Sequence, residues 1–315
     1  MRIIKQKTNF DFLGPLRRKL AISISSLVII SSFVALIGHD RPLEFGIDFT
    51  GGILLEVGYP GPADVERVRS NLADAGFPDA QVQVFGAPSE LLVRLPPQGN
   101  QDADELRGKL KDAVSAGIEG VELKRVESVS PQVGRELAER GALSMIIALL
   151  LIFVYVMIRF QWKFAAGAVA ALVHVVIITV GFFSIFRIEF DLTVVAAVLA
   201  VIGYSLNDTV VVFDRIRENF FKLRGIPAEE SMNVSINETL SRTINTGLTT
   251  LVVLIALLIF GGESIAPFSI ALIVGIVVGT YSSVYIASAI ALLLGINPID
   301  LIEPVKDPDL IDDLP

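Results

Sequence analysis

The sequence predicts a polytopic α-helical membrane protein with six transmembrane helices and one exported α+β domain. Of its 315 residues, 52% are hydrophobic and only 19% are charged, and the mean hydropathy is +0.64, which is too apolar for an ordinary soluble domain. The charges are clustered and leave uncharged stretches of the roughly 20 residues that a helix needs to cross a bilayer. One polar segment alternates strand and helix patterns, which indicates a folded domain outside the membrane.

Six stretches are long and apolar enough to span a membrane. They are residues 20–37, 141–158, 164–186, 192–213, 243–262 and 268–294. The first follows a basic tail, as in a signal peptide, but no small-residue cleavage site precedes His39 and Asp40. We therefore expect an uncleaved anchor, followed by a five-helix transmembrane bundle within residues 141–294.

Basic residues near the ends of these stretches predict the orientation of the chain. Short loops rich in lysine and arginine stay in the cytoplasm. The tail 1–19 carries six basic residues, and more follow the second and fourth stretches, whereas the short outer loops hold only Arg187. We therefore expect a multi-pass protein of the bacterial inner membrane with both termini in the cytoplasm, including the acidic tail 295–315, and with residues 38–140 in the periplasm.

The segment 38–140 is predicted to be an α+β domain. It is acidic and supplies nearly all of the net charge of −8. Residue patterns and turn residues predict, in order, strand 53–59, helix 63–75, strand 81–85, strand 91–95, helix 103–115 and strand 121–129. This βαββαβ order is that of a ferredoxin-like fold, and about 100 residues are enough to bury a core.

Two further patterns occur in the bundle. Residues 214–242 mix charged and apolar positions, which predicts a cytoplasmic amphipathic helix lying against the inner face of the membrane. Gly275, Gly279, Ser283 and Ala287 recur every four residues on the last stretch, forming a small-residue face that lets another helix approach closely. The sequence leaves open whether that helix is internal or belongs to another subunit.

The common catalytic and energy-coupling motifs are missing from the sequence. It has no phosphate-binding loop ending in Gly-Lys-Ser/Thr, no HExxH motif, no dinucleotide fingerprint, no cysteine and only two histidines. We therefore expect no enzymatic activity, no cofactor and no bound metal, and the negative net charge argues against a nucleic-acid partner. Any work should be driven by an ion gradient, which requires an ionisable group inside the membrane.

One carboxylate meets this requirement. Asp208 stands in the fourth stretch, which no other charged residue interrupts. Because a carboxylate in hydrocarbon costs at least a few kcal/mol, Asp208 should face the bundle interior or water and should have a partner. We interpret it as a residue that takes up and releases a proton. The alternative is a structural aspartate held permanently by a salt bridge.

The expected partner of Asp208 is Arg242, at the start of the fifth stretch. Helical spacing places Arg242, Thr246, Thr249 and Thr250 on one face, and Arg242 lies near the depth of Asp208. The two meet if the fourth and fifth helices are neighbours. Two alternatives stay open, since an arginine at a membrane boundary often extends to the interface and hydroxyl side chains also serve helix packing.

His174 is a weaker candidate for the ion pathway. It lies near the middle of the third stretch, where a histidine can relay protons at physiological pH. A histidine without a recognisable partner is more often a packing residue, so both interpretations remain open.

Three motifs together resemble those of a known family. They are residues 45–52 (Phe-Gly-Ile-Asp-Phe-Thr-Gly-Gly), residues 203–215 with Asn207 and Asp208, and residues 240–250 with Arg242. Together with six predicted spans and one large exported loop, they make the chain similar to the SecF-type subunits of the SecD/SecF family. This family of bacterial protein-export membrane proteins is a branch of the resistance, nodulation and division (RND) superfamily.

The resemblance implies a function in the Sec pathway. SecF-type subunits pair with SecD, act with the SecYEG channel, the SecA motor and often YajC, and use the proton or sodium motive force to promote late-stage export of preproteins. By position, Asp208 corresponds to the family's proton-carrying aspartate, Arg242 to its arginine partner and Thr246 to a polar residue of the same path. Asn207 and Thr249 lie beside them as weaker candidates.

The motif at residues 45–52 is expected to be structural. Gly51 and Gly52 can relieve a tight turn into the first strand of the domain without touching a substrate.

Two other functions remain open. One is a subunit of an RND-type small-molecule efflux transporter, although such pumps usually fuse two halves into one chain of twelve spans. The other is a non-coupled scaffold that stabilises a partner. Replacement of Asp208 by asparagine separates the possibilities, because only a coupled machine depends on this carboxylate.

Overall fold

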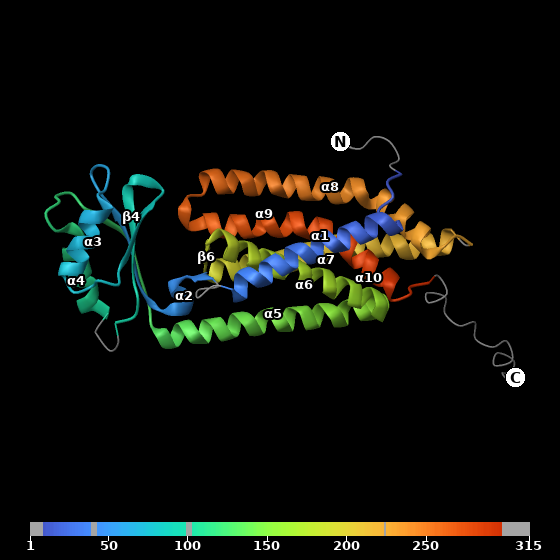
Figure 1. Cartoon of the computed structure of the whole chain (residues 1–315), viewed down its shortest axis with the longest axis horizontal. Helices are drawn as coiled ribbons and strands as arrows, with labels where there is room; N and C mark the ends of the chain where they lie inside the picture. Colours follow the sequence, from blue (N-terminus) through green and yellow to red (C-terminus); the bar gives the residue numbers. More distant parts are fainter. Residues whose placement is uncertain (1–8, 39–42, 99–102, 224, 298–315) are drawn as a thin grey trace, which may run out of the picture.

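The computed structural model describes residues 9–38, 43–98, 103–223 and 225–297. Most of the predicted basic and acidic tails (residues 1–8 and 298–315), together with His39 and Asp40, lie outside these residues. Figure 1 shows an elongated molecule in which long helices lie side by side and an α+β domain occupies one end.

Among the described residues, six helical segments are long and apolar enough to cross a membrane. Five are α1 (Pro15–Ile37), α5 (Pro131–Arg159), α6 (Trp162–Phe186), α7 (Leu192–Lys222) and α8 (Ala228–Phe260). The sixth combines η1 (Glu263–Ile265), α9 (Ala266–Tyr281), the π-helical turn η2 (Ser282–Ala287) and α10 (Ser288–Leu293). Each one overlaps one of the predicted stretches, so the prediction of six candidate transmembrane helices is confirmed.

Local sequence explains where several of these helices begin. Pro15 and Pro131 occupy the first turns of α1 and α5, where the missing N–H of proline removes no helical hydrogen bond. The hydroxyl of Ser130 caps α5 by accepting a hydrogen bond from the Val133 N–H at 3.3 Å. The carboxylate of Asp191 caps α7 in the same way.

Two predicted boundaries differ from the structure. The boundary at residue 140 falls inside α5, which runs without a break from the domain into the bundle. Residues 214–242 do not form a separate amphipathic helix, because this segment consists of the end of α7 and the beginning of α8, which pack against each other. Their charged positions interact between the two helices, as when Arg215 pairs with Glu238 at 2.6 Å, so they do not indicate a helix lying on a membrane surface.

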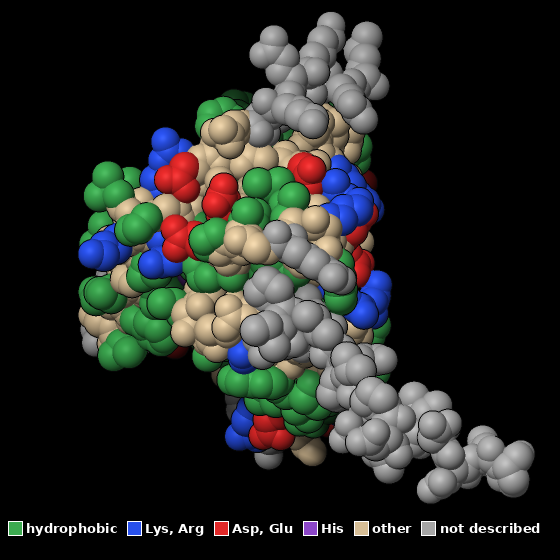
Figure 2. Space-filling view, turned by 90° about the vertical axis from the view of Figure 1, so that its right-hand side faces the viewer, with side chains coloured by type: hydrophobic (Ala, Val, Ile, Leu, Met, Phe, Trp, Pro, Cys, Tyr) green, Lys and Arg blue, Asp and Glu red, His purple; other side chains and the backbone are tan. Residues whose placement is uncertain are grey.

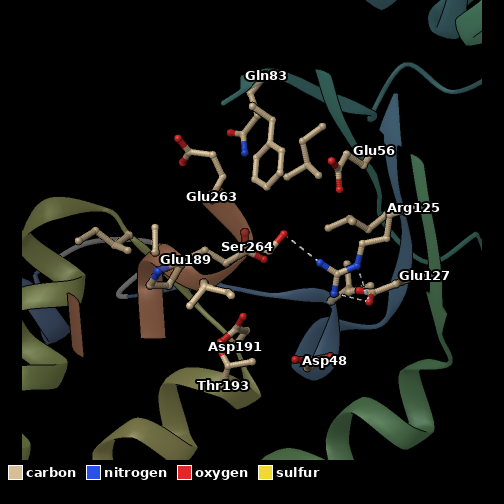
Figure 3. A pocket seen from close by; sticks show the side chains of 18 of the residues that line it. Asp48, Glu56, Gln83, Arg125, Glu127, Glu189, Asp191, Thr193, Glu263 and Ser264 are labelled. Carbon is tan, nitrogen blue, oxygen red and sulfur yellow. Dashed lines mark hydrogen bonds and ion pairs between the residues drawn. The ribbon is translucent and has the colours of Figure 1, made fainter. Parts of the chain in front are cut away.

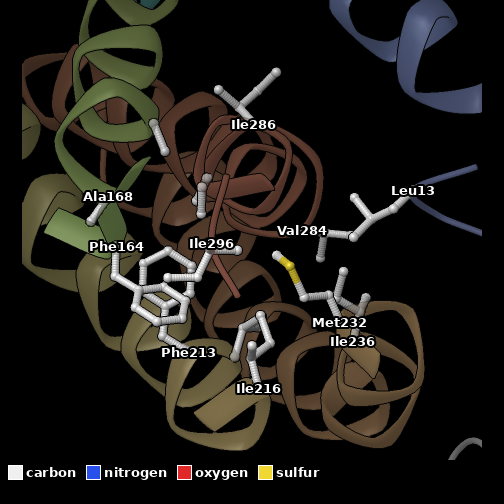
Figure 4. Close-up of a cluster of buried hydrophobic side chains, with 14 of the residues drawn as sticks. Leu13, Phe164, Ala168, Phe213, Ile216, Met232, Ile236, Val284, Ile286 and Ile296 are labelled. Atoms are coloured by element: carbon white, nitrogen blue, oxygen red, sulfur yellow. The ribbon is translucent and has the colours of Figure 1, made fainter. Parts of the chain in front are cut away.

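Helix α7 is the central element of the bundle. It packs against α6, α8 and α9, while α1 and α5 pack against α6. A buried cluster at the end away from the domain joins these helices, and Figure 4 shows Phe164 of α6 and Phe213 of α7 in contact, with Met232 and Ile236 of α8 nearby. The two phenylalanine rings lie 4.6 Å apart between centroids. This cluster fixes α7 and α8 relative to each other.

The small-residue face of the last span packs inside the chain. A Cβ atom added at Gly275 would lie 2.4 Å from Val201 of α7, and one added at Gly279 would lie 3.1 Å from the hydroxyl of Ser205. Glycine at these positions therefore permits the close approach of α9 to α7. The helix that packs on this part of the small-residue face belongs to the same chain and not to another subunit.

The α+β domain has the predicted order of elements. They are β2 (Gly52–Gly58), α3 (Val65–Asp74), β3 (Gln81–Phe85), β4 (Ala87–Leu95), α4 (Ala103–Ser115) and β5 (Glu122–Val129). The strands form one antiparallel sheet in the order β3-β4-β2-β5. The bounds agree with the predicted ranges to within two residues, except that β4 begins at Ala87 and not at residue 91.

The two faces of this sheet have different neighbours. Helices α3 and α4 cover the face away from the bundle (Figure 1), where Leu55 and Val93 pack with Leu110 in a buried core. Because successive side chains of a strand alternate between faces, Leu54 and Leu92 point to the other side. There they contact Ile47, and this second face turns toward the bundle.

A short joint connects the domain to the bundle. It consists of β1 (Glu44–Phe45), α2 (Ile47–Thr50) and β6 (Glu189–Phe190). Strand β1 pairs in parallel with β6, which belongs to the connection between α6 and α7. The carboxylate of Asp48 accepts a hydrogen bond from the N–H of Leu192 at 3.0 Å, and Arg94 of β4 forms an ion pair with Glu189 at 2.5 Å. The first turn of α7 is therefore tied directly to the joint.

The opposite end of the bundle is rich in charge. Figure 2 looks onto this end and shows Lys and Arg side chains interspersed with Asp and Glu. Its basic residues include Arg17, Arg18, Arg159, Lys163, Arg215, Arg217 and Lys222. Some of them are paired, as Arg159 is with Asp214 at 2.8 Å.

Candidate ion-coupling site between α7 and α8

Asp208 lies in the buried part of α7. Its side chain is only 3% exposed, and it is the only charged residue between Asp191 and Asp214. Within the described residues, its Oδ2 atom is buried and makes no hydrogen bond. A buried carboxylate with an unused acceptor oxygen can bind a proton or a cation.

Helix α8 brings two of the predicted residues to Asp208. The Thr246 hydroxyl and the positive charge of Arg242 both act on the Asp208 carboxylate from α8, while the hydrogen bonds that Thr246 makes in the structure go to carbonyl groups of its own helix. Among the described side chains, Arg242 makes no ion pair with Asp208 within 4.0 Å, so its influence is exerted at longer range. Asp208, Arg242 and Thr246 thus lie together in the structure, as the sequence predicted. The direct salt bridge to Arg242, which would mark Asp208 as a purely structural aspartate, is not formed among the described side chains.

The Thr246 hydroxyl has more than one acceptor within reach. It lies 3.1 Å from the carbonyl oxygen of Arg242 and 3.0 Å from that of Thr243. A hydroxyl carries a single proton that rotates to suit its surroundings. Thr246 can therefore donate either to Asp208 or to its own helix, depending on the charge of the carboxylate.

A second polar group, which the sequence did not single out, lies beside Asp208. The hydroxyls of Thr209 and Ser283 are hydrogen-bonded at 2.8 Å, and both also approach the carbonyl oxygen of Ser205. Ser283 belongs to the π-helical turn η2, and such turns occur frequently at functional sites. The only sequence signals were the hydroxyls next to Asp208 and the serine within the small-residue face.

One flank of the site is open on the surface of the chain. Asn207 of α7 and Arg242 and Thr249 of α8 are exposed, and Thr250 lies 3.5 Å from the hydroxyl of Tyr204 across the two helices. The predicted polar face of α8 is therefore real, and it continues onto α7. Polar side chains facing lipid are costly, so this flank is suited to cover by another protein.

His174 does not join this group. It is 4% exposed, and neither ring nitrogen has a hydrogen-bond partner among the described residues. Its ring lies 6.2 Å from that of Tyr281, whose hydroxyl is bonded to the carbonyl oxygen of Ala21 on α1 at 2.9 Å. The structure thus places His174 in the packing between helices and shows no link to Asp208 within the described part of the chain.

The segment 45–52 forms the turn between α2 and the sheet. Gly51 has φ 73° and ψ 177°, a conformation that is essentially restricted to glycine. A Cβ atom on Gly51 would lie 2.8 Å from the nitrogen of Pro131, and one on Gly134 would lie 2.8 Å from the carbonyl oxygen of Phe49. The glycines therefore allow α2 and α5 to approach each other closely, in agreement with the expected structural role.

Two family models match the chain. The model described as "Protein export membrane protein SecD/SecF, C-terminal" matches residues 109–297, and the model described as "SecD/SecF GG Motif" matches residues 40–59. The first covers α7 and α8 with Asp208, and the second covers the glycine turn of the joint.

Similar proteins carry one common name. The protein translocase subunit SecF of Vibrio alginolyticus is 50% identical over 287 residues, which are 91% of this chain and 90% of the relative. The subunit of the same name from Pseudomonas aeruginosa is 50% identical over 277 residues, which are 87% of this chain and 89% of the relative.

A solved structure has the same fold. The crystal structure of SecDF from Thermus thermophilus, described as a translocon-associated membrane protein, matches with a TM-score of 0.82 and 36% identity over 93% of this chain. The matched region is only 39% of the Thermus chain. A second structure, SecDF in a super-membrane-facing form, matches with a lower TM-score of 0.66 at the same identity and coverage.

The fold and the site define a multi-pass membrane protein with one folded domain outside its helices and an ionisable group between them. The family matches and the relatives make this class specific. The chain belongs to the SecD/SecF family of protein-export membrane proteins.

Proposed function

We propose that the chain is an accessory subunit of the Sec protein translocase that, together with SecD, uses the proton or sodium motive force to promote late-stage export of preproteins. Its relatives are named protein translocase subunits. The observation that carries the coupling proposal is the buried carboxylate of Asp208 facing Thr246 and Arg242 across α7 and α8.

The arrangement suits reversible ion binding. When Asp208 is charged, the Thr246 hydroxyl and the positive charge of Arg242 stabilise it. When Asp208 is neutralised, Thr246 donates to the carbonyl groups of its own helix instead, since these lie within 3.1 Å. The two states therefore differ in the contact between α7 and α8.

Helix α7 provides a path from this contact to the domain. Its first turn is bound by Asp48 through the N–H of Leu192 and is capped by Asp191, which follows β6 of the joint. A shift of α7 that follows ion binding would move the joint and, with it, the α+β domain. In this proposal, the domain acts on the exported polypeptide by movement and has no catalytic function.

SecD is the first proposed partner. The Thermus structure is a SecDF protein, and this chain matches only 39% of it, which leaves room for a SecD-like part. The exposed polar flank formed by Asn207, Arg242 and Thr249 fits cover by such a part. We propose SecYEG, SecA and YajC as further members of the assembly, and preprotein as a transient partner, by analogy with the family.

The proposed location is the bacterial inner membrane. The end of the bundle opposite the domain carries clustered basic residues, including Arg17, Arg159 and Arg215 (Figure 2), and such residues favour the cytoplasmic side. Both termini would then be cytoplasmic and the α+β domain periplasmic. We further propose that this domain is ferredoxin-like, which its βαββαβ order and antiparallel sheet support.

The test is the variant Asp208→Asn, with Asp214→Asn as a matched control. Asp214 lies on the same helix but is partly exposed and paired with Arg159, so its neutralisation removes an equal charge from outside the site. Export of a secretory precursor is measured in cells lacking the native subunit, with and without a protonophore or sodium ionophore. Abundance of the variants and their binding to SecD are measured in parallel.

We expect Asp208→Asn to lose all gradient-dependent stimulation of export at normal abundance, and Asp214→Asn to keep it. Normal stimulation in Asp208→Asn would refute the coupling function and would leave a passive scaffold as the better description. Export of small molecules without any effect on precursors would support an efflux function instead.

A further inference from the structure

A cavity of about 810 Å³ lies between the α+β domain and the outer end of the bundle. We call it the outer cavity. One wall is the sheet face that α3 and α4 leave uncovered, and the other is built from the α6–α7 and α8–α9 connections, with α2 beside them. Figure 3 shows these side chains converging from both sides. The proposed function above assigns no ligand to it.

The outer cavity is strongly acidic. Its lining includes Asp48, Glu56, Glu127, Glu189, Asp191 and Glu263, against a single basic residue, Arg125. A concave site lined by one sign of charge concentrates ions of the opposite sign. The charge of the cavity therefore favours a cationic occupant.

Most of the carboxylates already have partners. Arg125 binds Glu127 at 2.8 Å and Ser264 at 3.1 Å, Glu189 is paired with Arg94, and Asp48 and Asp191 accept hydrogen bonds at the start of α7.

Two carboxylates differ from the others. Glu56 on the sheet and Glu263 on the α8–α9 connection make no ion pair within 4.0 Å and no carboxylate hydrogen bond with the described residues, although Glu56 interacts with the charge of Lys124 at longer range. They belong to opposite walls of the outer cavity, so basic groups along an occupant could meet a carboxylate on either wall (Figure 3).

Most of the remaining lining is apolar. Leu54, Phe85 and Leu92 line the sheet side, and Ile265 and Ile270 line the bundle side. Lysine and arginine side chains combine an aliphatic stem with a charged head. A chain that carries basic and aliphatic side chains would satisfy both kinds of lining.

Strand β3 adds a feature that favours a polypeptide over a small cation. It is one of the two edge strands of the sheet and, among the described strands, pairs with β4 alone, and its residues Gln83, Val84 and Phe85 line the outer cavity. An edge strand presents unpaired N–H and C=O groups to which an extended peptide can add as a further strand. Val84 of this strand is 52% exposed, and the Arg69 side chain reaches the carbonyl oxygen of Val82 at 3.5 Å, so a peptide strand would pair beyond that contact.

We propose that the outer cavity binds an extended polypeptide segment that carries both basic and aliphatic side chains, with Glu56 and Glu263 contacting the basic groups and the edge of β3 contacting the backbone. The proposal rests on the proposed function, because a protein-export subunit encounters unfolded chains on the side of its α+β domain. It adds a binding site and a substrate preference to that function.

Direct binding to the full chain tests this proposal. The chain has no cysteine, so Gln83→Cys provides a single attachment point for an environment-sensitive fluorophore within the outer cavity. The labelled protein is placed in lipid nanodiscs and titrated with a peptide of about eight residues that alternates lysine with valine, long enough to span the five residues of β3 at roughly 3.3 Å per residue. Matched peptides carry glutamate for lysine, or N-methyl groups on alternate amides.

Two double variants are compared. The first carries Glu56→Gln and Glu263→Gln, and the control carries Asp79→Asn and Glu119→Gln. Asp79 and Glu119 are exposed and lie outside the lining, so both pairs change the net charge equally. We expect the first pair to weaken binding of the lysine peptide about tenfold, as two partly exposed charge pairs would, and the control pair to leave it unchanged. Binding should weaken as salt is added, and the glutamate and N-methylated peptides should bind poorly.

Several results would overturn the proposal. They are failure of the lysine peptide to bind, equal weakening in both variant pairs, or equal binding of the N-methylated peptide. If added SecD occupies the labelled cavity and the peptide does not displace it, the cavity is a subunit interface and the proposal is wrong. Asp208→Asn should bind the peptide normally, so loss of ion coupling and loss of peptide binding are distinguished.

Discussion

Replacement of Gly51 by alanine should open the joint between the sheet and α5. The added Cβ atom would lie 2.8 Å from the nitrogen and 2.9 Å from the Cα atom of Pro131, and 3.1 Å from the carbonyl oxygen of Val129. These are backbone atoms and cannot move aside like the end of a flexible side chain. The backbone of Gly51, at φ 73° and ψ 177°, must change as well.

The size of the effect follows from these two terms. Holding a residue other than glycine in this conformation costs about 1–3 kcal/mol, and forcing an extra methyl group into a packed site typically costs about 1–3 kcal/mol. Alanine also reduces the entropy of the unfolded chain, which returns about 0.4–1 kcal/mol. The net destabilisation is therefore about 1–5 kcal/mol, which corresponds to a roughly fivefold or greater increase in local opening.

Hydrogen exchange on the full chain in nanodiscs measures this opening. The amide of Leu55 is a suitable reporter, since β2 pairs there with Val126 of β5. Gly61→Ala is the matched control, because a Cβ atom there meets nothing within 4 Å and Gly61 does not have a positive φ. We expect faster exchange in Gly51→Ala and unchanged exchange in Gly61→Ala.

Wild-type exchange in Gly51→Ala would show that the joint adapts to a side chain at this position. Equal acceleration in both variants would show that the domain responds to any added methyl group. Either result would refute the steric explanation of the glycine turn.

Three other changes test contacts elsewhere in the chain. Burial raises the pKa of Glu189 above its ordinary value of 4.5, so its contribution to stability is fully present below that value and is lost as the pH rises through the raised pKa. The melting temperature should therefore fall over this interval in the wild type and fall less in Glu189→Gln, whereas equal slopes would contradict the assignment. Thr209→Val removes a buried hydrogen bond to Ser283 and should cost about 1–3 kcal/mol in unfolding experiments; additive effects with Ser283→Ala would show that the two hydroxyls do not interact. Arg125→Cys with Ser264→Cys, joined by a reducible bifunctional cross-linker, should block export until reductant is added, and full activity of the cross-linked protein would show that the domain works without moving.

The sequence alone predicted the candidate transmembrane helices and the order of elements in the domain. Both depend on local properties, since a continuous apolar stretch or an alternating strand pattern is recognisable without its neighbours. It also identified Asp208, because a charge within an apolar stretch is conspicuous wherever the helix packs. Segment 214–242 was misjudged because its mixed pattern is the same for a helix on a membrane surface and for two helices that cover each other.

Only the tertiary structure decided which of these residues meet. Thr246 reaches Asp208 because α7 and α8 pack with a particular rotation, and Ser283 reaches Thr209 because glycines allow α9 to lie close to α7. The outer cavity is formed by segments as distant as β2 and the α8–α9 connection. Hydrophobicity determines that a segment enters the membrane, but the rotation and separation of packed helices depend on the complementary shapes of residues far apart in the chain.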